Sequence, residues 1–213
     1  MEVYISFIVL PEATADECPA PYGLPAMVYD RASRYASTHQ QLLSLWGYAL
    51  LRDAIGTAGI GSMDSLRFAG NGKPSLMSGP FFSIAHSGNM VVCAVCSNAE
   101  IGVDIELVND MRNDDLRTYF SGREWQMAAA NDSRLSMLNI WVRKEAILKA
   151  TGEGIGDDLH LLDVVDDEVQ RQYGKWFLCD LAMPAGYAGC IAAAKAVTKI
   201  HMEDKSALLR LNR

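Results

Sequence analysis

A predicted helix between about residues 133 and 151 carries two charged side chains on the face that should be apolar. Glu145 and Lys149 are one turn apart in the middle of this face, whereas Arg143 points the other way, where a solvated charge is expected. Because burying an unpaired charge costs several kcal/mol, the pair needs a partner: each other, a metal ion or a ligand. At about 100° per residue, the apolar positions of this face are Leu135, Leu138, Trp141, Val142 and Ala146.

Residues 99–108 alternate with a period of two and predict a half-buried strand. One face carries the carboxylates of Asp104 and Glu106, with Gly102 leaving room beside them. Like charges on neighbouring positions repel each other, and a cation relieves that repulsion. Oxygen ligands suit a hard ion such as Mg²⁺, which commonly takes one or two protein carboxylates together with substrate phosphates. The alternative is the polar outer face of an antiparallel strand.

Groups suited to phosphate binding precede this strand. A strand from residue 80 ends in a polar turn at His86, Ser87 and Gly88, and an apolar strand follows over residues 90–96. Ser87 and Gly88 offer a hydroxyl and open backbone N–H groups, and His86 adds a donor that can be cationic near neutral pH. Upstream, Lys73 lies in a glycine- and proline-containing turn. The alternatives are a strand-end histidine bonded to backbone and a solvated lysine. In chain order, the whole set suggests Mg²⁺-dependent chemistry on a phosphate ester or anhydride.

Four short motifs, in order, resemble the signature of the 4′-phosphopantetheinyl transferases. Within that family the chain is similar to the Sfp-type branch, which carries a W-x-x-K-E-A motif, and the resemblance extends from about residue 66 to residue 155. The motifs are Gly72-Lys73-Pro74, Phe82-Ser83-Ile84-Ala85-His86-Ser87, Ile101-Gly102-Val103-Asp104-Ile105-Glu106, and Trp141-Val142-Arg143-Lys144-Glu145-Ala146 with Lys149.

The resemblance implies that the phosphopantetheine arm of coenzyme A is transferred to a serine of an apo acyl or peptidyl carrier protein, with 3′,5′-ADP as the other product. It implies that Mg²⁺ would be held by Asp104, Glu106 and Glu145. Charge on the bridging phosphates would be neutralised by Lys149, with Lys144 assisting. The adenosine and 3′-phosphate end would be held by Lys73, Pro74, His86 and Ser87.

Two further expectations concern individual residues. A serine hydroxyl is a poor nucleophile at its free pKa, so we hypothesise that Glu145 both touches the metal and takes the serine proton, directly or through water. Family members usually carry an arginine on the first long helix to grip the CoA 3′-phosphate, but residues 37–44 contain no arginine or lysine. Arg31, Arg34 or His39 could substitute for it.

The pattern of elements predicts an α+β fold. Beside those above, we expect a strand at 3–10, one helix at 31–55 that stops near Gly56 to Gly59, and a helix opened by the capping box Ser121 to Glu124. Strands are expected at 176–181 and 187–194, and a short helix or a loose tail at 205–213. The resemblance implies two similar α+β halves, residues 1–98 and 99–213, related by a pseudo-twofold axis with the active site in the cleft between them. Such a chain would act as a monomer.

Composition narrows the class of protein. A net charge of −7 argues against nucleic-acid binding, because affinity there comes mainly from phosphate neutralisation. No apolar stretch approaches the ~20 residues that a membrane helix needs. The five cysteines show no disulfide-scaffold pattern, so we expect a reducing cytoplasm and buried free thiols at Cys93 and Cys96. An acidic chain would recognise acidic carrier proteins through an apolar patch with local cations; candidates are Arg112, Arg117 and Arg123, although solvated helix charges are an equal interpretation.

Two rival functions stay open. A Mg²⁺-dependent phosphohydrolase acting on CoA or a nucleotide anhydride would use the same carboxylates, and it would cleave CoA without any carrier protein. A non-catalytic protein that binds CoA or a carrier would show no turnover, and its CoA binding would not depend on Mg²⁺.

Overall fold

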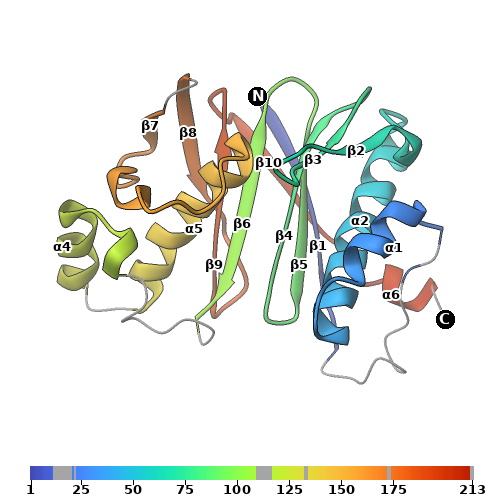
Figure 1. The fold of residues 1–213 in the computed structure, drawn as a ribbon, viewed down its shortest axis with the longest axis horizontal. Helices are drawn as coiled ribbons and strands as arrows, with labels where there is room; N and C mark the ends of the chain where they lie inside the picture. Colours follow the sequence, from blue (N-terminus) through green and yellow to red (C-terminus); the bar gives the residue numbers. More distant parts are fainter. Residues whose placement is uncertain (12–20, 22, 109–116, 132–133, 172–173, 212–213) are drawn as a thin grey trace.

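Two four-stranded sheets form the middle of the molecule, and they pack against each other (Figure 1). The computed structural model describes residues 1–11, 21, 23–108, 117–131, 134–171 and 174–211. The first sheet has the order β10-β1-β5-β4, with β1 (Glu2–Val9), β4 (Phe81–Ser87), β5 (Met90–Cys96) and β10 (Lys199–Asp204). The second has the order β6-β9-β8-β7, with β6 (Ile101–Leu107), β7 (Glu168–Arg171), β8 (Gly174–Asp180) and β9 (Tyr187–Ala193). The strands β2 (Leu66–Phe68) and β3 (Pro74–Leu76) form a separate hairpin.

Helices cover the outer faces of the two sheets. Figure 1 shows α2 (Thr38–Ala58) and α5 (Arg134–Thr151) on opposite sides of the molecule. In the described ranges, the other helices are α1 (Ala26–Ala32), α4 (Gly122–Asn131), α6 (Leu208–Leu211) and the short 3₁₀ turns η1 (Met63–Ser65), η2 (Arg117–Tyr119) and η3 (Leu159–Leu161). Each half therefore has a four-stranded sheet backed by one long helix, which confirms the predicted α+β class.

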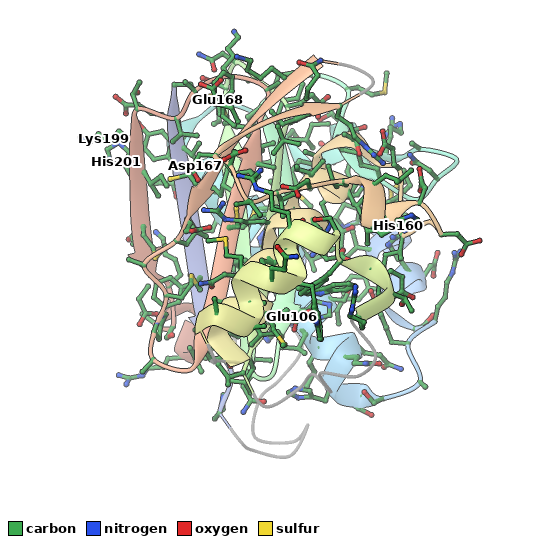
Figure 2. The ribbon with its side chains drawn as sticks, turned by 90° about the vertical axis from the view of Figure 1, so that its left-hand side faces the viewer. Glu106, His160, Asp167, Glu168, Lys199 and His201 are labelled. Atoms are coloured by element: carbon green, nitrogen blue, oxygen red, sulfur yellow. The ribbon has the colours of Figure 1, made fainter. Side chains whose placement is uncertain are left out.

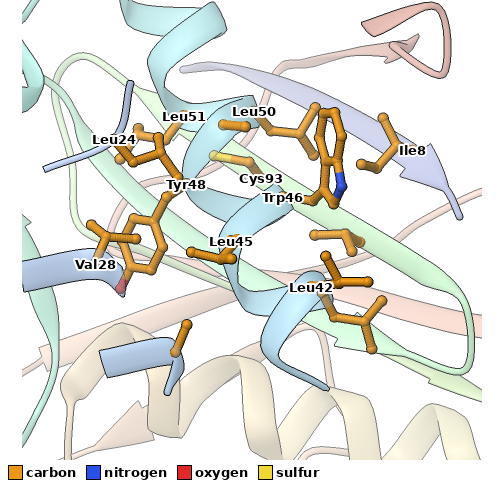
Figure 3. Close-up of a cluster of buried hydrophobic side chains, with 14 of the residues drawn as sticks. Ile8, Leu24, Val28, Leu42, Leu45, Trp46, Tyr48, Leu50, Leu51 and Cys93 are labelled. Carbon is orange, nitrogen blue, oxygen red and sulfur yellow. The ribbon is translucent and has the colours of Figure 1, made fainter. Parts of the chain in front are cut away.

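The central strand β5 explains how the layers are joined. Every one of its residues is buried, because one face of the strand packs on α2 and the other on the second sheet. Figure 3 shows Cys93 on the α2 side among Leu45, Trp46 and Leu50, whereas Cys96 belongs to the core between the sheets. Both thiols are free and buried, as expected. They belong to different cores because residues three apart on a strand point to opposite faces.

The two sheets meet where the edge strands β4 and β6 lie beside each other. The hydroxyl of Ser83 accepts a hydrogen bond from the N–H of Val103 at 3.0 Å, and that of Ser87 accepts one from Leu107 at 3.0 Å. An edge strand exposes N–H groups that need partners. Here two serine side chains supply those partners, so the junction does not depend on a regular backbone ladder.

The single helix predicted at 31–55 is wrong, because residues 33–37 are not helical and separate α1 from α2. Ser37 has an extended backbone, and its hydroxyl accepts the N–H of Gln40 at 3.1 Å, which is an N-cap for α2. The predicted stop is confirmed, since α2 ends at Gly59 with a left-handed φ of 64°.

A strand that the sequence did not predict completes the first sheet. Residues 199–204 form β10, which pairs with β1 in parallel register from Glu2↔Lys199 to Phe7↔Asp204. Lys199 and His201 lie on this strand at the margin of the molecule (Figure 2). The division into halves at residues 98 and 99 stays a prediction, and the last strand and α6 lie with the first half. Within the described part of the chain, none of the helices is both long and apolar enough to cross a membrane.

Candidate active site

A cleft of about 490 Å³ lies between the two halves. One wall comes from α1, α2, the β2–β3 turn and β4, and the other comes from α5 and the loop that follows it. The lining residues used below are Arg31, Tyr35, Asn71, Lys73, Pro74, His86, Glu145, Lys149, Gly152 and Glu153.

Close packing of α5 on β6 brings the charged residues together. A Cβ atom at Gly102 would collide with the carbonyl oxygen of Ala146 and the backbone nitrogen of Ala150. The glycine therefore leaves room for the helix backbone rather than for a ligand. With α5 this close, Glu145 and Lys149 lie next to Asp104, whereas Ile101, Val103 and Ile105 face the core between the sheets. The predicted alternation of the two faces is confirmed, but the strand is not half-buried: residues 101–105 are all buried, because α5 covers the face that carries Asp104.

Asp104 and Lys149 form an ion pair with Nζ 2.6 Å from Oδ1. The side chain of Asp104 is only 6% exposed, and burial raises its pKa while the charge of Lys149 opposes that rise. Burial also acts to lower the pKa of Lys149, but the charge and hydrogen bond of Asp104 and the charges of Glu145 and Glu106 outweigh it, so this pKa is raised. The ammonium thus stays charged among three carboxylates.

Glu145 has the properties of a proton acceptor. Burial, and then the charge of Asp104, raise its pKa to about 7, and Lys149 opposes them. Within the described residues, Oε1 of Glu145 and Oδ2 of Asp104 are buried without a hydrogen-bond partner. A buried carboxylate oxygen without a partner is costly, and a cation would satisfy both oxygens. These two residues therefore fit a hard divalent cation.

The predicted third metal ligand is arranged differently. Glu106 accepts a hydrogen bond from the hydroxyl of Ser87 at 2.6 Å. Among the residues that the structure describes, no group of three histidines, cysteines or acids is arranged to hold a metal ion. Ser87, which we expected at a phosphate, instead orients Glu106 and receives the N–H of Leu107.

His86 lies in the cleft, but not as the expected cation. Burial, and then the charge of Lys149, lower its pKa to about 4. Its ring meets that of Tyr35 edge to face at 6.3 Å. In this structure the imidazole is therefore neutral near pH 7.

Lys144 is not at the cleft. Its side chain is fully buried in the second half, where Nζ lies 2.9 Å from the carboxylate of Glu124 and donates to the carbonyls of Leu159 and Leu162. The capping box is confirmed, because Glu124 accepts the N–H of Ser121 at 2.7 Å. The box alone does not explain Glu124, however, since the same carboxylate is the partner of Lys144.

Arg143 is not a solvated charge. Its side chain is 14% exposed, and it bonds Asp180 at 2.7 Å and Asp167 at 3.0 Å as well as two backbone carbonyls. The expectation was wrong because the partners come from the β7–β8 region, far along the chain.

The remaining predicted cations fall in several places. Arg31 lines the cleft, with its guanidinium 4.7 Å from the centre of the Phe68 ring, and Arg34 lines a neighbouring hollow. The ring of His39 hydrogen-bonds the carbonyl of Gly88 at 3.0 Å. Lys73 and Pro74 both line the cleft, and Lys73 also pairs with Glu100 at 2.8 Å.

Of the suggested carrier-binding arginines, Arg112 lies outside the described residues. Arg117 lies 4.8 Å from the centre of the Trp125 ring, and Arg123 pairs with Asp166 at 2.8 Å.

The sequence did not single out Tyr35, Asn71 or the segment 152–155 as part of the cleft. Asn71 lies in the same turn as Lys73, and Gly152 directly follows the predicted helix at 133–151. Only the fold places these two signals side by side.

The fold and the cleft together define an α+β protein whose two halves enclose a buried acid, a lysine and a possible cation position. Residues 100–192 match the model of the 4′-phosphopantetheinyl transferase superfamily. Sfp-like members of this superfamily are among the proteins to which the chain is similar, which confirms the resemblance.

Three relatives give the extent of the similarity. The chain is 34% identical over 119 residues to the 4′-phosphopantetheinyl transferase psf-1 of Bacillus pumilus, covering 53% of this chain and 51% of that protein. It is 31% identical over 127 residues to the transferase gsp of Aneurinibacillus migulanus, covering 57% and 53%. It is 25% identical over 179 residues to the transferase Sfp of Bacillus subtilis, covering 78% and 80%. The chain thus spans about half the length of psf-1 and gsp in these matches.

Proposed function

We propose that this chain transfers the 4′-phosphopantetheine of coenzyme A to a serine hydroxyl of an apo acyl or peptidyl carrier protein, in a Mg²⁺-dependent reaction. The match of residues 100–192 to the superfamily model and the names of the relatives support the reaction class. The observation that carries the proposal is the buried Glu145, with a pKa of about 7, beside the Asp104–Lys149 pair in the cleft.

In the proposed step, the serine oxygen bonds to the phosphorus that carries the pantetheine arm. The anhydride bond to the other phosphate breaks, and 3′,5′-ADP leaves. The serine proton passes to the carboxylate of Glu145, directly or through water, so that Glu145 acts as the general base. Lys149 stabilises the negative charge that develops on the phosphate oxygens.

Asp104 and Glu145 would hold Mg²⁺, with Glu106 as a further candidate beside them. When bound, the ion would offset the charge of the pyrophosphate that otherwise repels the attacking oxygen. Burial of Asp104 and the two oxygens without partners support this assignment. The test with a readout besides activity is thermal unfolding. Mg²⁺ should raise the melting temperature of the wild type and not that of Asp104→Asn.

The first half would bind the nucleotide end of coenzyme A. Arg31 is the cation of that wall best placed to meet the 3′-phosphate, since Arg34 lines a different hollow and His39 is bonded to Gly88. Pro74 and His86 also line this wall of the cleft. A phosphate bound near His86 would raise the pKa of its imidazole.

Product analysis separates the proposal from its rivals. Coenzyme A, Mg²⁺ and the chain would be incubated with and without an apo carrier protein, and CoA and 3′,5′-ADP would be quantified by chromatography. Formation of 3′,5′-ADP only with the carrier, and its loss on chelation of Mg²⁺, supports the transferase. Cleavage of CoA without a carrier would instead support the phosphohydrolase. Binding of CoA without turnover would support the non-catalytic binding protein.

A further inference from the structure

The turn between β2 and β3, in the first half, bonds the C-terminal end of α5, in the second half. The side-chain amide of Asn71 donates to the carbonyl of Gly152 at 2.7 Å. The ammonium of Lys73 donates to the carbonyl of Ala150 and pairs with Glu100 at 2.8 Å. The side-chain oxygen of Asn71 also accepts the backbone N–H of Lys73 at 3.1 Å, which holds the Asn71 side chain against the turn.

These bonds meet a general need of helix ends. The last carbonyls of a helix have no partner within it, and they carry the negative end of the helix dipole. A lysine and an amide from the other half supply donors to two carbonyls of the region 150–152, so the end of α5 is closed by a segment some 80 residues earlier.

Gly152 is required by the same contact. Its φ is +78°, a left-handed value that favours glycine, and a Cβ there would lie 2.7 Å from Nδ2 of Asn71 and 3.2 Å from Cδ of Lys73. A larger residue would therefore strain the backbone at this position and displace the side chain of Asn71.

We infer that Asn71 and Lys73 form a clasp on the end of α5 and that Lys73 is a positioning residue rather than a ligand of the CoA phosphates. The helix that the clasp holds carries Glu145 and Lys149, and Lys149 directly precedes the clasped Ala150. The clasp thus sets these side chains against the wall formed by Arg31 and His86. This inference rests on the proposed function for its kinetic consequence, but not for its structural one.

Hydrogen exchange of the whole chain tests the structural consequence without any activity. In Lys73→Met and Asn71→Ala, amides at the end of α5 should exchange about tenfold faster, because each variant removes a hydrogen bond that closes the helix. The matched control is Lys175→Met, which removes an exposed lysine paired with Glu168 at 2.7 Å between β7 and β8 and should leave α5 unchanged. Unchanged exchange in both clasp variants would overturn the inference. Should Lys73→Met fail to fold, Asn71→Ala still decides it, since that residue carries no charge.

Kinetics with two substrates then separates positioning from binding. Lys73→Met should lower kcat by the same factor with coenzyme A and with 3′-dephospho-CoA, and Lys73→Arg should restore part of the loss. A defect confined to the KM of coenzyme A, and absent with 3′-dephospho-CoA, would make Lys73 a ligand of the 3′-phosphate and contradict the inference. Were the wild type inactive with both substrates, the proposed function would fail while the exchange result would still stand.

Discussion

Nζ of Lys149 lies 2.6 Å from Oδ1 of Asp104, across the contact between α5 and β6. This pair joins the helix that carries Glu145 to the strand that carries the other two carboxylates. The pair fixes how the charged side chains of the cleft lie relative to one another. Single substitutions can therefore test the role of each of these residues.

Lys149→Met should destabilise the chain by about 1–3 kcal/mol, because it leaves the buried carboxylate of Asp104 without its partner. The lysine is 33% exposed, so solvent screening keeps the loss below that of a fully buried pair. Urea unfolding at pH 7 measures it, with Lys175→Met as the control for an exposed pair. Equal stability of the two variants would show that the Asp104–Lys149 contact contributes nothing.

The raised pKa of Glu145 makes a prediction about pH. Because the folded pKa, about 7, is above the usual value, protonated Glu145 favours the folded state. This contribution is fully present below the unfolded pKa and is lost as the pH rises through 7. Without metal, Glu145→Gln should therefore gain stability relative to the wild type between about pH 4.5 and 7.5. A stability difference that stays flat over this range would contradict the raised pKa.

The buried pair of Lys144 and Glu124 should be structural. Both side chains are 0% exposed, so Lys144→Met leaves an unpaired buried carboxylate and should cost about 3–5 kcal/mol. The double variant Lys144→Met/Glu124→Gln should recover part of this loss, because it removes both charges. Denaturant unfolding of the two single variants and the double variant gives the coupling. Independent, additive effects would mean that the two groups do not interact.

Gly102→Ala should disturb the site from a distance. The added methyl group meets the backbone of α5, and overpacking of this kind costs about 1–3 kcal/mol. Since α5 must move, Glu145 and Lys149 move with it, and turnover should fall even in the protein that remains folded. Gly56→Ala, on α2 with open space at its Cβ position, is the control. Similar activity of the two variants would contradict the account of Gly102.

Most of the sequence predictions that the structure confirms were based on local periodicity. The alternation of β6 placed Asp104 and Glu106 on one face, and the spacing in α5 placed Glu145 and Lys149 together, because both patterns depend only on local geometry. Gly59 and the Ser121–Glu124 box marked helix ends for the same reason.

The errors arose where a partner comes from elsewhere in the chain. Nothing near Lys144 in the sequence indicates that Glu124 will neutralise it, and nothing near Arg143 indicates Asp167 and Asp180. Strand β10 pairs with the first residues of the chain, so its formation depends on a contact across almost the whole sequence. The lowered pKa of His86 likewise follows from burial that only the assembled cleft produces.

The most direct test of the central claim is the intact mass of an apo carrier protein after incubation with coenzyme A, Mg²⁺ and three forms of the chain. These are the wild type, Glu145→Gln and Glu153→Gln; Glu153 is a matched carboxylate that also lines the cleft but pairs with Arg171 at 2.8 Å. We predict that the wild type and Glu153→Gln add the mass of phosphopantetheine, and that Glu145→Gln does so at least about 100-fold more slowly. Modification by Glu145→Gln at the wild-type rate would contradict the assignment of Glu145 as the base.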